Sequence, residues 1–230
     1  MAQRRKAKRG RRIPLTRERV ITAALELADE HGVDALSMRK LGAALGVEAM
    51  ALYNHVRNKD EILDALVDGV FSEVELSDEK GPWRAEMRKR ALGMQAALLR
   101  PRWATGLLES RTNPGPENLR HHNAVLGCLR HAGFDPATAV HAYSALDSYI
   151  YGFALQQHTL PFETPAQQRA LVEHMLTMLP ADEYPHLREV ATDLIMVRGF
   201  DHAEEFAYGL DLILDGLERA LAATEPPRAP

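Results

Sequence analysis

Hydrogen-bonding, aromatic and cationic side chains are concentrated in one stretch near the N-terminus. Met38 to Arg57 reads MRKLGAALGVEAMALYNHVR. Arginine, asparagine, tyrosine and histidine side chains bind base edges and phosphates when a helix presents them to the major groove of DNA. The chemistry that this stretch offers is recognition of double-stranded DNA by contact, without bond breaking.

Two short helices are needed to position these side chains. Apolar residues recur where such a pair buries a common core, at Leu41, Leu45, Val47 and Leu52. Gly42 is small where the helices cross, and Gly46 suits a tight turn with positive φ. The spacing predicts a helix-turn-helix whose recognition helix runs from Glu48 to His55. A plain helical hairpin in a globular core has the same pattern, so the hairpin alone does not show that the protein binds DNA.

The distribution of charge favours DNA over the plain hairpin. The whole chain has a net charge of −4, but up to Lys59 it carries thirteen basic and six acidic residues. Met1 to Ile13 is a basic arm with almost no apolar content, a composition that predicts disorder. Such an arm can lie along phosphates or in a minor groove, although it can also serve as a solubilising tail. A basic head on an acidic body indicates that DNA meets the N-terminal end.

Helical periodicity runs through the rest of the chain, without a persuasive strand pattern. Thr16, Ser37 and Asn58 are candidate N-caps, with Glu61 in capping-box position after Asn58, and Gly32 is expected to end the first helix. Further helices are predicted over residues 59–74, 83–100, 103–110, 117–132, 136–158 and 166–179 and from Asp201 onward, with loops at 77–82, 112–118, 159–165 and from residue 180. The predicted fold class is all-α, with an N-terminal three-helix helix-turn-helix domain followed by a larger helical domain.

Several other classes of protein are disfavoured by the composition. No apolar run reaches the ~18–20 residues that span a bilayer, and no apolar segment follows the basic N-terminus as in a secretory signal. The single cysteine, Cys128, cannot build a disulfide framework or a multi-cysteine zinc site, and the ten histidines show no metal-ligand spacing. We therefore expect a cytoplasmic protein without a membrane partner, a metal site or a cofactor.

The chain resembles the TetR family of transcriptional regulators. Between Thr16 and Asp68 the resemblance is carried by ITAALELADEHG, LSMRKLGAALGV and ALYNHVRNKDEIL. Farther on, SRTNPGPENLR, LRHAGFDPATAVHAYSALDSYIYGFAL and GFDHAEEFAYGLDLILDGLERAL are similar to the tetracycline-repressor type of C-terminal domain. The predicted organisation is a disordered basic arm over residues 1–13, a helix-turn-helix DNA-binding domain with its connecting helix over 14–74, a helical regulatory and dimerisation domain over 75–223, and a disordered tail over 224–230.

The family's DNA contacts transfer to ten positions of this sequence. The resemblance implies that Arg39 contacts a base, and that Tyr53, His55 and Lys59 clamp phosphates. Met50 stands where the tetracycline repressor has a proline, so a different operator sequence is expected. The complete set of implied DNA-binding residues is Met38, Arg39, Glu48, Ala49, Met50, Ala51, Tyr53, Asn54, His55 and Lys59.

The same resemblance implies a homodimer and a ligand pocket. The helices at 136–158 and 201–222 would form a four-helix bundle with their copies, and Gly209 and Gly216 would allow close approach. The alternative is that these helices face only an internal core. Tetracycline–magnesium is not expected as the ligand, because Leu107 and Gln156 stand where the tetracycline repressor has the histidine and the glutamate that bind the chelate. Candidate ligand contacts are Trp103, Arg111, Asn113, His121, His122, Tyr149, Phe153 and Gln156.

The favoured interpretation is a homodimeric repressor that a small-molecule ligand releases from a palindromic operator. An architectural DNA-binding protein without an effector is the alternative. An all-helical enzyme is less favoured still, because the chain has no Gly-rich phosphate loop, HExxH motif or nucleophile elbow, and nothing orders His122, His141 and Asp147 into a triad. The effector, the operator, the target genes and the sign of the ligand's effect on DNA binding are left open by the sequence.

Overall fold

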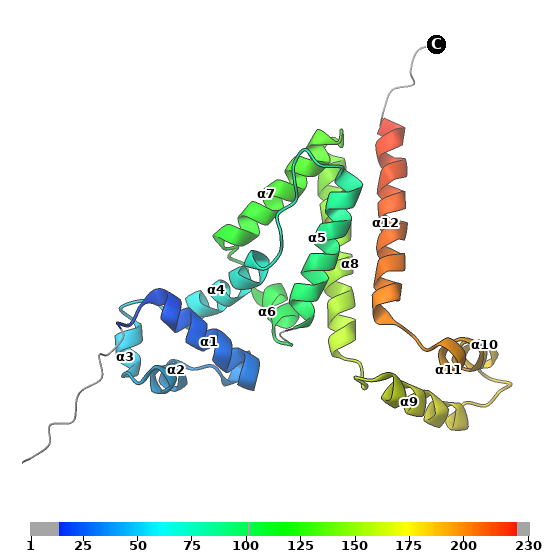
Figure 1. Ribbon diagram of the computed structural model, residues 1–230, viewed down its shortest axis with the longest axis horizontal. Coiled ribbons are helices and arrows are strands. Elements are labelled where there is room, and N and C mark those ends of the chain that lie inside the picture. The colour runs from blue at the N-terminus through cyan, green and yellow to red at the C-terminus, as the bar shows by residue number, and fades with distance from the viewer. Residues whose placement is uncertain (1–13, 101, 225–230) are drawn as a thin grey trace, which may run out of the picture.

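The computed structural model describes residues 14–100 and 102–224, and this part of the chain contains helices and no strand (Figure 1). Three helices form a small head at one end: α1 (Arg17–His31), α2 (Met38–Leu45) and α3 (Ala49–Leu52). A short 3₁₀ turn, η1 (Val33–Ala35), joins α1 to the segment before α2. The predicted all-α class and helix-turn-helix head are confirmed, whereas the basic arm and the C-terminal tail lie outside the described residues.

Local side-chain chemistry sets the ends of the head's helices. The hydroxyls of Thr16 and Ser37 accept hydrogen bonds from backbone N–H groups of the first turns of α1 and α2. The Asn58 side chain caps the next helix in the same way, accepting from the Glu61 N–H at 2.8 Å. Gly32 and Gly46 end α1 and α2 with φ of 78° and 67°, in the positive-φ region that residues other than glycine rarely adopt. These predicted caps and stops are confirmed.

Helix α4 (Lys59–Ser72) leads from the head into the body (Figure 1). The body is built from α5 (Trp83–Leu99), α6 (Ala104–Ser110), α7 (Pro116–His131), α8 (Pro136–His158) and α12 (His202–Thr224). Within it α5 packs on α8, α12 lies against both α5 and α8, and α4 packs on α7 and α6. These helices begin and end within a few residues of the predicted limits, and α8 has the predicted limits.

One uninterrupted hydrophobic core runs from the head into the body. In the head it contains Val20, Leu41 and Leu52, and in the body it contains Met94 and Leu146, all completely buried. The two parts meet along α4, which packs on α1 of the head and on α5, α6 and α7 of the body. A movement of α4 relative to the body therefore moves the head.

The segment after α8 forms a separate group of helices at one end of the body (Figure 1). It consists of α9 (Pro165–Met178), α10 (Pro185–Glu189), the π-helical turn η2 (Val190–Ile195) and α11 (Met196–Arg198), which contact one another. The prediction of a loop from residue 180 was wrong for residues 185–198. Their helices are short, and many of their apolar side chains are exposed, so the pattern lacks the buried stripe that marks a longer helix. None of the described helices is long and apolar enough to cross a membrane.

Candidate DNA interface and ligand cavities

The turn between α2 and α3 depends on a glycine at the crossing. A Cβ atom on Gly42 would lie 2.9 Å from the Val47 carbonyl oxygen and 3.1 Å from the Ala49 nitrogen. Any side chain here would therefore push α3 away from α2. The Gly42 carbonyl also accepts a hydrogen bond from the Val47 N–H at 2.9 Å, which fixes the angle between the two helices.

The recognition segment is shorter as a helix than the sequence suggested. Helix α3 covers Ala49–Leu52, and residues 53–55 continue as a turn in which the His55 N–H bonds the Leu52 carbonyl at 2.8 Å. The predicted helix from Glu48 to His55 was wrong at both ends. Leu52 is completely buried, whereas Met50 is 74% and Tyr53 45% exposed. Leu52 thus anchors the segment in the core, while Met50 and Tyr53 on either side of it are exposed to solvent.

All ten DNA-contact candidates are at least partly accessible to solvent. Arg39, Glu48, Met50, Tyr53 and Asn54 are exposed. The remaining candidates are half-buried: Met38, Ala49, Ala51, His55 and Lys59. Their roles on DNA remain predictions.

Contacts of the Glu61 side chain hold the N-terminus of α4 in place. The Glu61 carboxylate accepts from the Arg57 backbone N–H at 2.9 Å and forms ion pairs with Arg17 and Arg57, each at 3.2 Å. The hydrogen bond from the Arg57 backbone is the main reason why the pKa of Glu61 lies below its usual value. Glu61 therefore bonds Arg57 rather than the Asn58 backbone that a capping box would use. This brace holds α1, the recognition segment and α4 together.

The positive charge of the N-terminal region lies mainly in its arm. Between residues 14 and 59 the head has six basic and six acidic residues, whereas Met1 to Ile13 has seven basic residues and no acidic one. The described head is therefore neutral overall. Attraction to the phosphate backbone would depend largely on the arm.

Three of the ligand candidates line one cavity in the body. We call it the Asp147 cavity; it has a volume of about 360 Å³ and is enclosed by parts of α4, α6, α7 and α8 and by the loop after α6. Arg111, Asn113 and His122 line it, with further lining from Asn118, Tyr143, Asp147 and Tyr151. The rings of His122 and Tyr143 lie 4.3 Å apart, and the His122 Nδ1 lies 2.8 Å from Asn118 Oδ1. Aromatic faces and hydrogen-bonding groups thus alternate around the cavity.

Asp147, which lines this cavity, forms a buried ion pair with Arg90. The Arg90 Nη2 lies 2.7 Å from Asp147 Oδ1, and the Arg90 side chain is 2% exposed. Burial is the largest single influence on the pKa of Arg90 and lowers it, but the charge and hydrogen bond of Asp147 together with the neighbouring Tyr151 and Tyr143 outweigh burial, and the net shift is upward. The Tyr151 hydroxyl donates to the other Asp147 oxygen at 3.2 Å. The arginine guanidinium also lies over the Tyr143 ring, 5.6 Å from its centre.

The loop that lines the Asp147 cavity is attached to α4 by three aspartates. Arg111 pairs with Asp64 at 2.6 Å and with Asp60 at 3.0 Å, and these contacts are the main reason why its pKa is raised. Asp68 accepts from the Asn118 backbone N–H at 2.9 Å. Asp60, Asp64 and Asp68, which we call the aspartate ladder, are four residues apart and share one face of α4. Sequence reasoning missed the ladder, although this spacing was its visible signal.

The other ligand candidates lie elsewhere. The Trp103 indole N–H donates to Asp29 of the head at 2.7 Å. His121 is buried against Phe71, and the Tyr149 hydroxyl bonds the Phe206 carbonyl at 3.0 Å, between α8 and α12. Tyr149 and Phe153 both pack on the Phe206 ring. Gln156 is exposed on α8.

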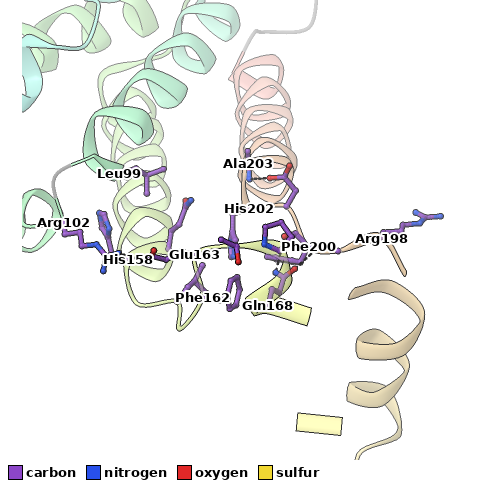
Figure 2. A pocket seen from close by; sticks show the side chains of 16 residues that line it. Leu99, Arg102, His158, Phe162, Glu163, Gln168, Arg198, Phe200, His202 and Ala203 are labelled. Atoms are coloured by element: carbon purple, nitrogen blue, oxygen red, sulfur yellow. Dashed lines mark hydrogen bonds and ion pairs between the residues drawn. The ribbon is translucent and has the colours of Figure 1, made fainter. Parts of the chain in front are cut away.

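A second cavity lies where α8, α9 and α12 approach one another (Figure 2). We call it the His202 cavity; it measures about 650 Å³. Figure 2 shows His202, Phe200 and Gln168 on one side and His158 with Arg102 on the other. The Nε2 of His202 is buried without a hydrogen-bond partner in the described part of the chain, and burial lowers the pKa of this histidine. None of the sequence-predicted ligand residues lines this cavity.

Two family models match the sequence. The model "Bacterial regulatory proteins, tetR family" matches residues 20–66, and "Tetracyclin repressor-like, C-terminal domain" matches residues 77–221. An HTH-type transcriptional regulator of Saccharopolyspora erythraea is 37% identical over 70% of this chain and 69% of its own length. The HTH-type transcriptional repressor DrrR1 of Streptomyces coeruleorubidus is 32% identical over 98% of this chain and 86% of its own length.

Solved structures of ActR from Streptomyces coelicolor have a similar fold. The chain aligns with apo ActR with a TM-score of 0.77 and 28% identity, covering 93% of this chain and 99% of that one. ActR in complex with actinorhodin aligns with a TM-score of 0.74 and 28% identity, over 91% of this chain and 99% of that one.

Proposed function

Because the chain belongs to the TetR family of bacterial transcriptional regulators, we propose that it represses by binding a palindromic operator as a homodimer and leaves the operator when a small molecule fills the Asp147 cavity. The single observation that carries this mechanism is the aspartate ladder. It joins the loop that lines the cavity to α4, the helix that leads into the DNA-binding head.

The proposed dimer uses the outward faces of α8 and α12. Ala145, Ser148 and Gly152 form an exposed strip of small residues on α8, and Tyr208 and Leu212 are exposed on α12. Small residues allow two helices to approach closely, and exposed apolar side chains gain by being covered. A dimer would present two recognition segments to half-sites about 34 Å apart, one turn of DNA. Gly209 has a different role from the expected one, because it accommodates Tyr149 of its own protomer.

The walls of the Asp147 cavity favour a hydroxylated aromatic effector. Tyr143 and His122 offer aromatic faces for a planar ring. The Asp147 carboxylate can accept a hydrogen bond from a phenolic hydroxyl, and Asn113 can bond a carbonyl. Actinorhodin, bound in the related ActR structure, supports a natural product as the effector here. We therefore propose a polyhydroxylated aromatic compound, such as a hydroxyanthraquinone.

Coupling follows from the attachment of the cavity loop to α4. A ring system that enters beside Asn113 would displace the loop between Arg111 and Asn118, and the ladder would transmit that displacement to α4. Gly115 packs so closely on Asp68 that a Cβ atom there would clash with the carboxylate, so the loop cannot move inward independently. Since coupling is reciprocal, operator DNA weakens effector binding by the same factor.

The ladder can be tested by changing two carboxylates to amides. We expect Asp64→Asn with Asp68→Asn to keep operator affinity within about 3-fold of wild type while losing most of the effector response. Allosteric couplings are typically roughly 5–150-fold, and in the proposed mechanism the ladder carries this coupling. The measurement is fluorescence anisotropy on DNA from upstream of the chain's own gene, with excess nonspecific DNA, before and after a hydroxyanthraquinone is added.

Exposed Asp182, changed to Asn, is the matched control and should respond like wild type. Release of operator from the double variant at the wild-type effector concentration would contradict the coupling. If nonspecific DNA abolishes binding to every candidate operator, the result favours the architectural alternative instead.

A further inference from the structure

A third cavity lies at the joint between head and body. We call it the joint cavity; its volume is about 830 Å³, and it is lined by residues of α1 and α4 and by Arg100, Arg102 and Trp103. Its α4 lining includes Leu66, Gly69 and Val70, which face away from the aspartate ladder because of the helical period. It is therefore separate from the Asp147 cavity, on the other side of the same helix.

The lining of the joint cavity is mainly apolar, and its charges balance. Ala28, Leu66 and Val70 are buried in its walls, and Leu25 is partly exposed at its edge. The charged residues around it are Asp29, Glu73, Arg100 and Arg102, two of each sign. Arg100 is paired with Glu73, and Arg102 with Glu163 at 2.5 Å. The arginines therefore offer no unpaired charge to an anionic ligand, and Asp29 is hydrogen-bonded to the Trp103 N–H, whereas an apolar ligand would gain from the walls.

Gly69, an exposed residue in the last turn of α4, adds no side chain to this space. A Cβ atom on Gly69 would have no neighbouring atom within 4 Å, and its φ is not in the left-handed region, so neither crowding nor backbone geometry requires glycine there. Glycine inside a helix is unfavourable relative to alanine. A residue that weakens the helix and leaves its surface bare is consistent with space kept for another molecule.

We propose that the joint cavity is a second small-molecule site, which takes an uncharged, mainly apolar polycyclic compound. The compound would lie between Leu25 of α1 and Trp103, along the bare surface at Gly69. The cavity's volume lies within the range of roughly 300–1,000 Å³ that is typical of ligand pockets. Because the Trp103–Asp29 hydrogen bond joins body to head across this cavity, an occupant there would alter the position of the head without using the Asp147 cavity.

Trp103 makes the site directly observable. The chain has two tryptophans, so a Trp83→Phe background leaves Trp103 as the sole indole fluorophore. The probe is Nile red, an uncharged polycyclic dye. We expect saturable binding with one dye per chain and quenching of the Trp103 emission by at least about half, because the dye would lie against the indole. The anionic dye anilinonaphthalene sulfonate should bind at least about tenfold more weakly, since every nearby arginine is paired.

Gly69→Leu fills the cavity and Gly69→Ala serves as its matched control, because both improve helix propensity. In the Trp83→Phe background, Gly69→Leu should lose saturable Nile red binding and Gly69→Ala should keep it within about threefold. The far-ultraviolet circular dichroism and the melting temperature of the Gly69→Leu variant check that it is folded. Equal dye binding by the two variants, or no quenching of Trp103 in the parent, would overturn the proposal. Neither result depends on the effector of the Asp147 cavity.

Discussion

At the scale of single residues, Arg90 is the charge that the fold encloses most completely. Removing a guanidinium from water is costly unless an anion and hydrogen-bond acceptors replace the solvent. Asp147 supplies the anion at 2.7 Å, and the Tyr143 ring supplies a polarisable face. The pair thus holds α5 to α8, and its carboxylate also lines the Asp147 cavity. In the proposed function Asp147 therefore serves both the stability of the body and the recognition of the ligand.

Asp147→Ala should destabilise the protein by about 3–5 kcal/mol, because it leaves a buried arginine without its anion. The measurement is the free energy of unfolding from urea denaturation. Replacing both partners, Arg90→Met with Asp147→Leu, should recover a large part of that loss, because no buried charge then remains. A single variant as stable as wild type would contradict the role of the pair.

Arg39 is the residue whose loss should affect DNA binding most selectively. It is exposed on α2, and the cap at Ser37 that positions the helix does not depend on its side chain. Arg39→Ala should weaken operator binding by about 1–3 kcal/mol, the value of a good base contact, and leave the melting temperature unchanged. Titration of wild-type operator and of operators changed at single positions would locate the base. Equal weakening on nonspecific DNA would instead assign Arg39 to the phosphate backbone.

At the scale of elements, α4 carries contacts that belong to three different functions. Its first turn is braced by Glu61 beneath the recognition segment, its ladder face holds the cavity loop, and its C-terminal half packs against α7. In that last contact, the buried His121 of α7 lies against Phe71 of α4, with ring centres 5.8 Å apart. Burial is the main cause of the lowered pKa of His121, and the charge of Arg90 adds to it.

The contact between α4 and α7 should weaken in acid. Because the pKa of His121 in the folded state is below the ordinary 6.5, the unfolded chain binds more protons, and stability is lost as the pH falls from above 6.5 toward the folded pKa. We expect His121→Gln to reduce the loss of unfolding free energy measured between about pH 7.5 and about pH 5.5. Exposed His141, changed to Gln, is the control. An unchanged pH dependence in the His121 variant would contradict this role.

How far the sequence predicted each element depended on how local its determinants are. The caps at Thr16, Ser37 and Asn58 and the limits of α8 depend on neighbouring residues, so they could be read directly. The helices between residues 185 and 198 could not, because their apolar residues do not form one buried stripe. The end of α3 also differs, since residues 53–55 form a turn whose hydrogen bonds converge on Leu52.

The cavities were less predictable than the helices because they are made by contacts between distant segments. Arg111 and His122 were candidates for their chemistry, and they do line one cavity. Trp103 was chosen for the same reason but lies at the joint cavity, where it bonds Asp29. The spacing of the aspartate ladder marks one face of α4, but spacing alone does not say that Arg111 covers that face.

At the scale of the whole molecule, the proposed dimer should depend on the small residues of α8. A Cβ atom on Gly152 would meet no atom of its own protomer within 4 Å, so Gly152→Arg should fold and fail to dimerise. We expect sedimentation velocity to detect monomers and operator affinity to fall by at least about 100-fold, since each monomer can hold only one half-site. Gly106 on α6 has equally open surroundings, and Gly106→Arg should remain a dimer. A dimeric Gly152 variant would place the interface elsewhere.

The uninterrupted core at α4 limits how such a chain can recombine with its relatives. The interval between the two family matches, residues 67–76, begins inside α4 and includes Phe71, which is buried in the body. A crossover there joins the first part of one connecting helix to the last part of another. A crossover just after this interval brings the relative's counterpart of Phe71 into a body that is packed around the Phe71 of this chain. New pairings of operator and effector should therefore arise most readily between chains whose bodies already accept each other's connecting helix.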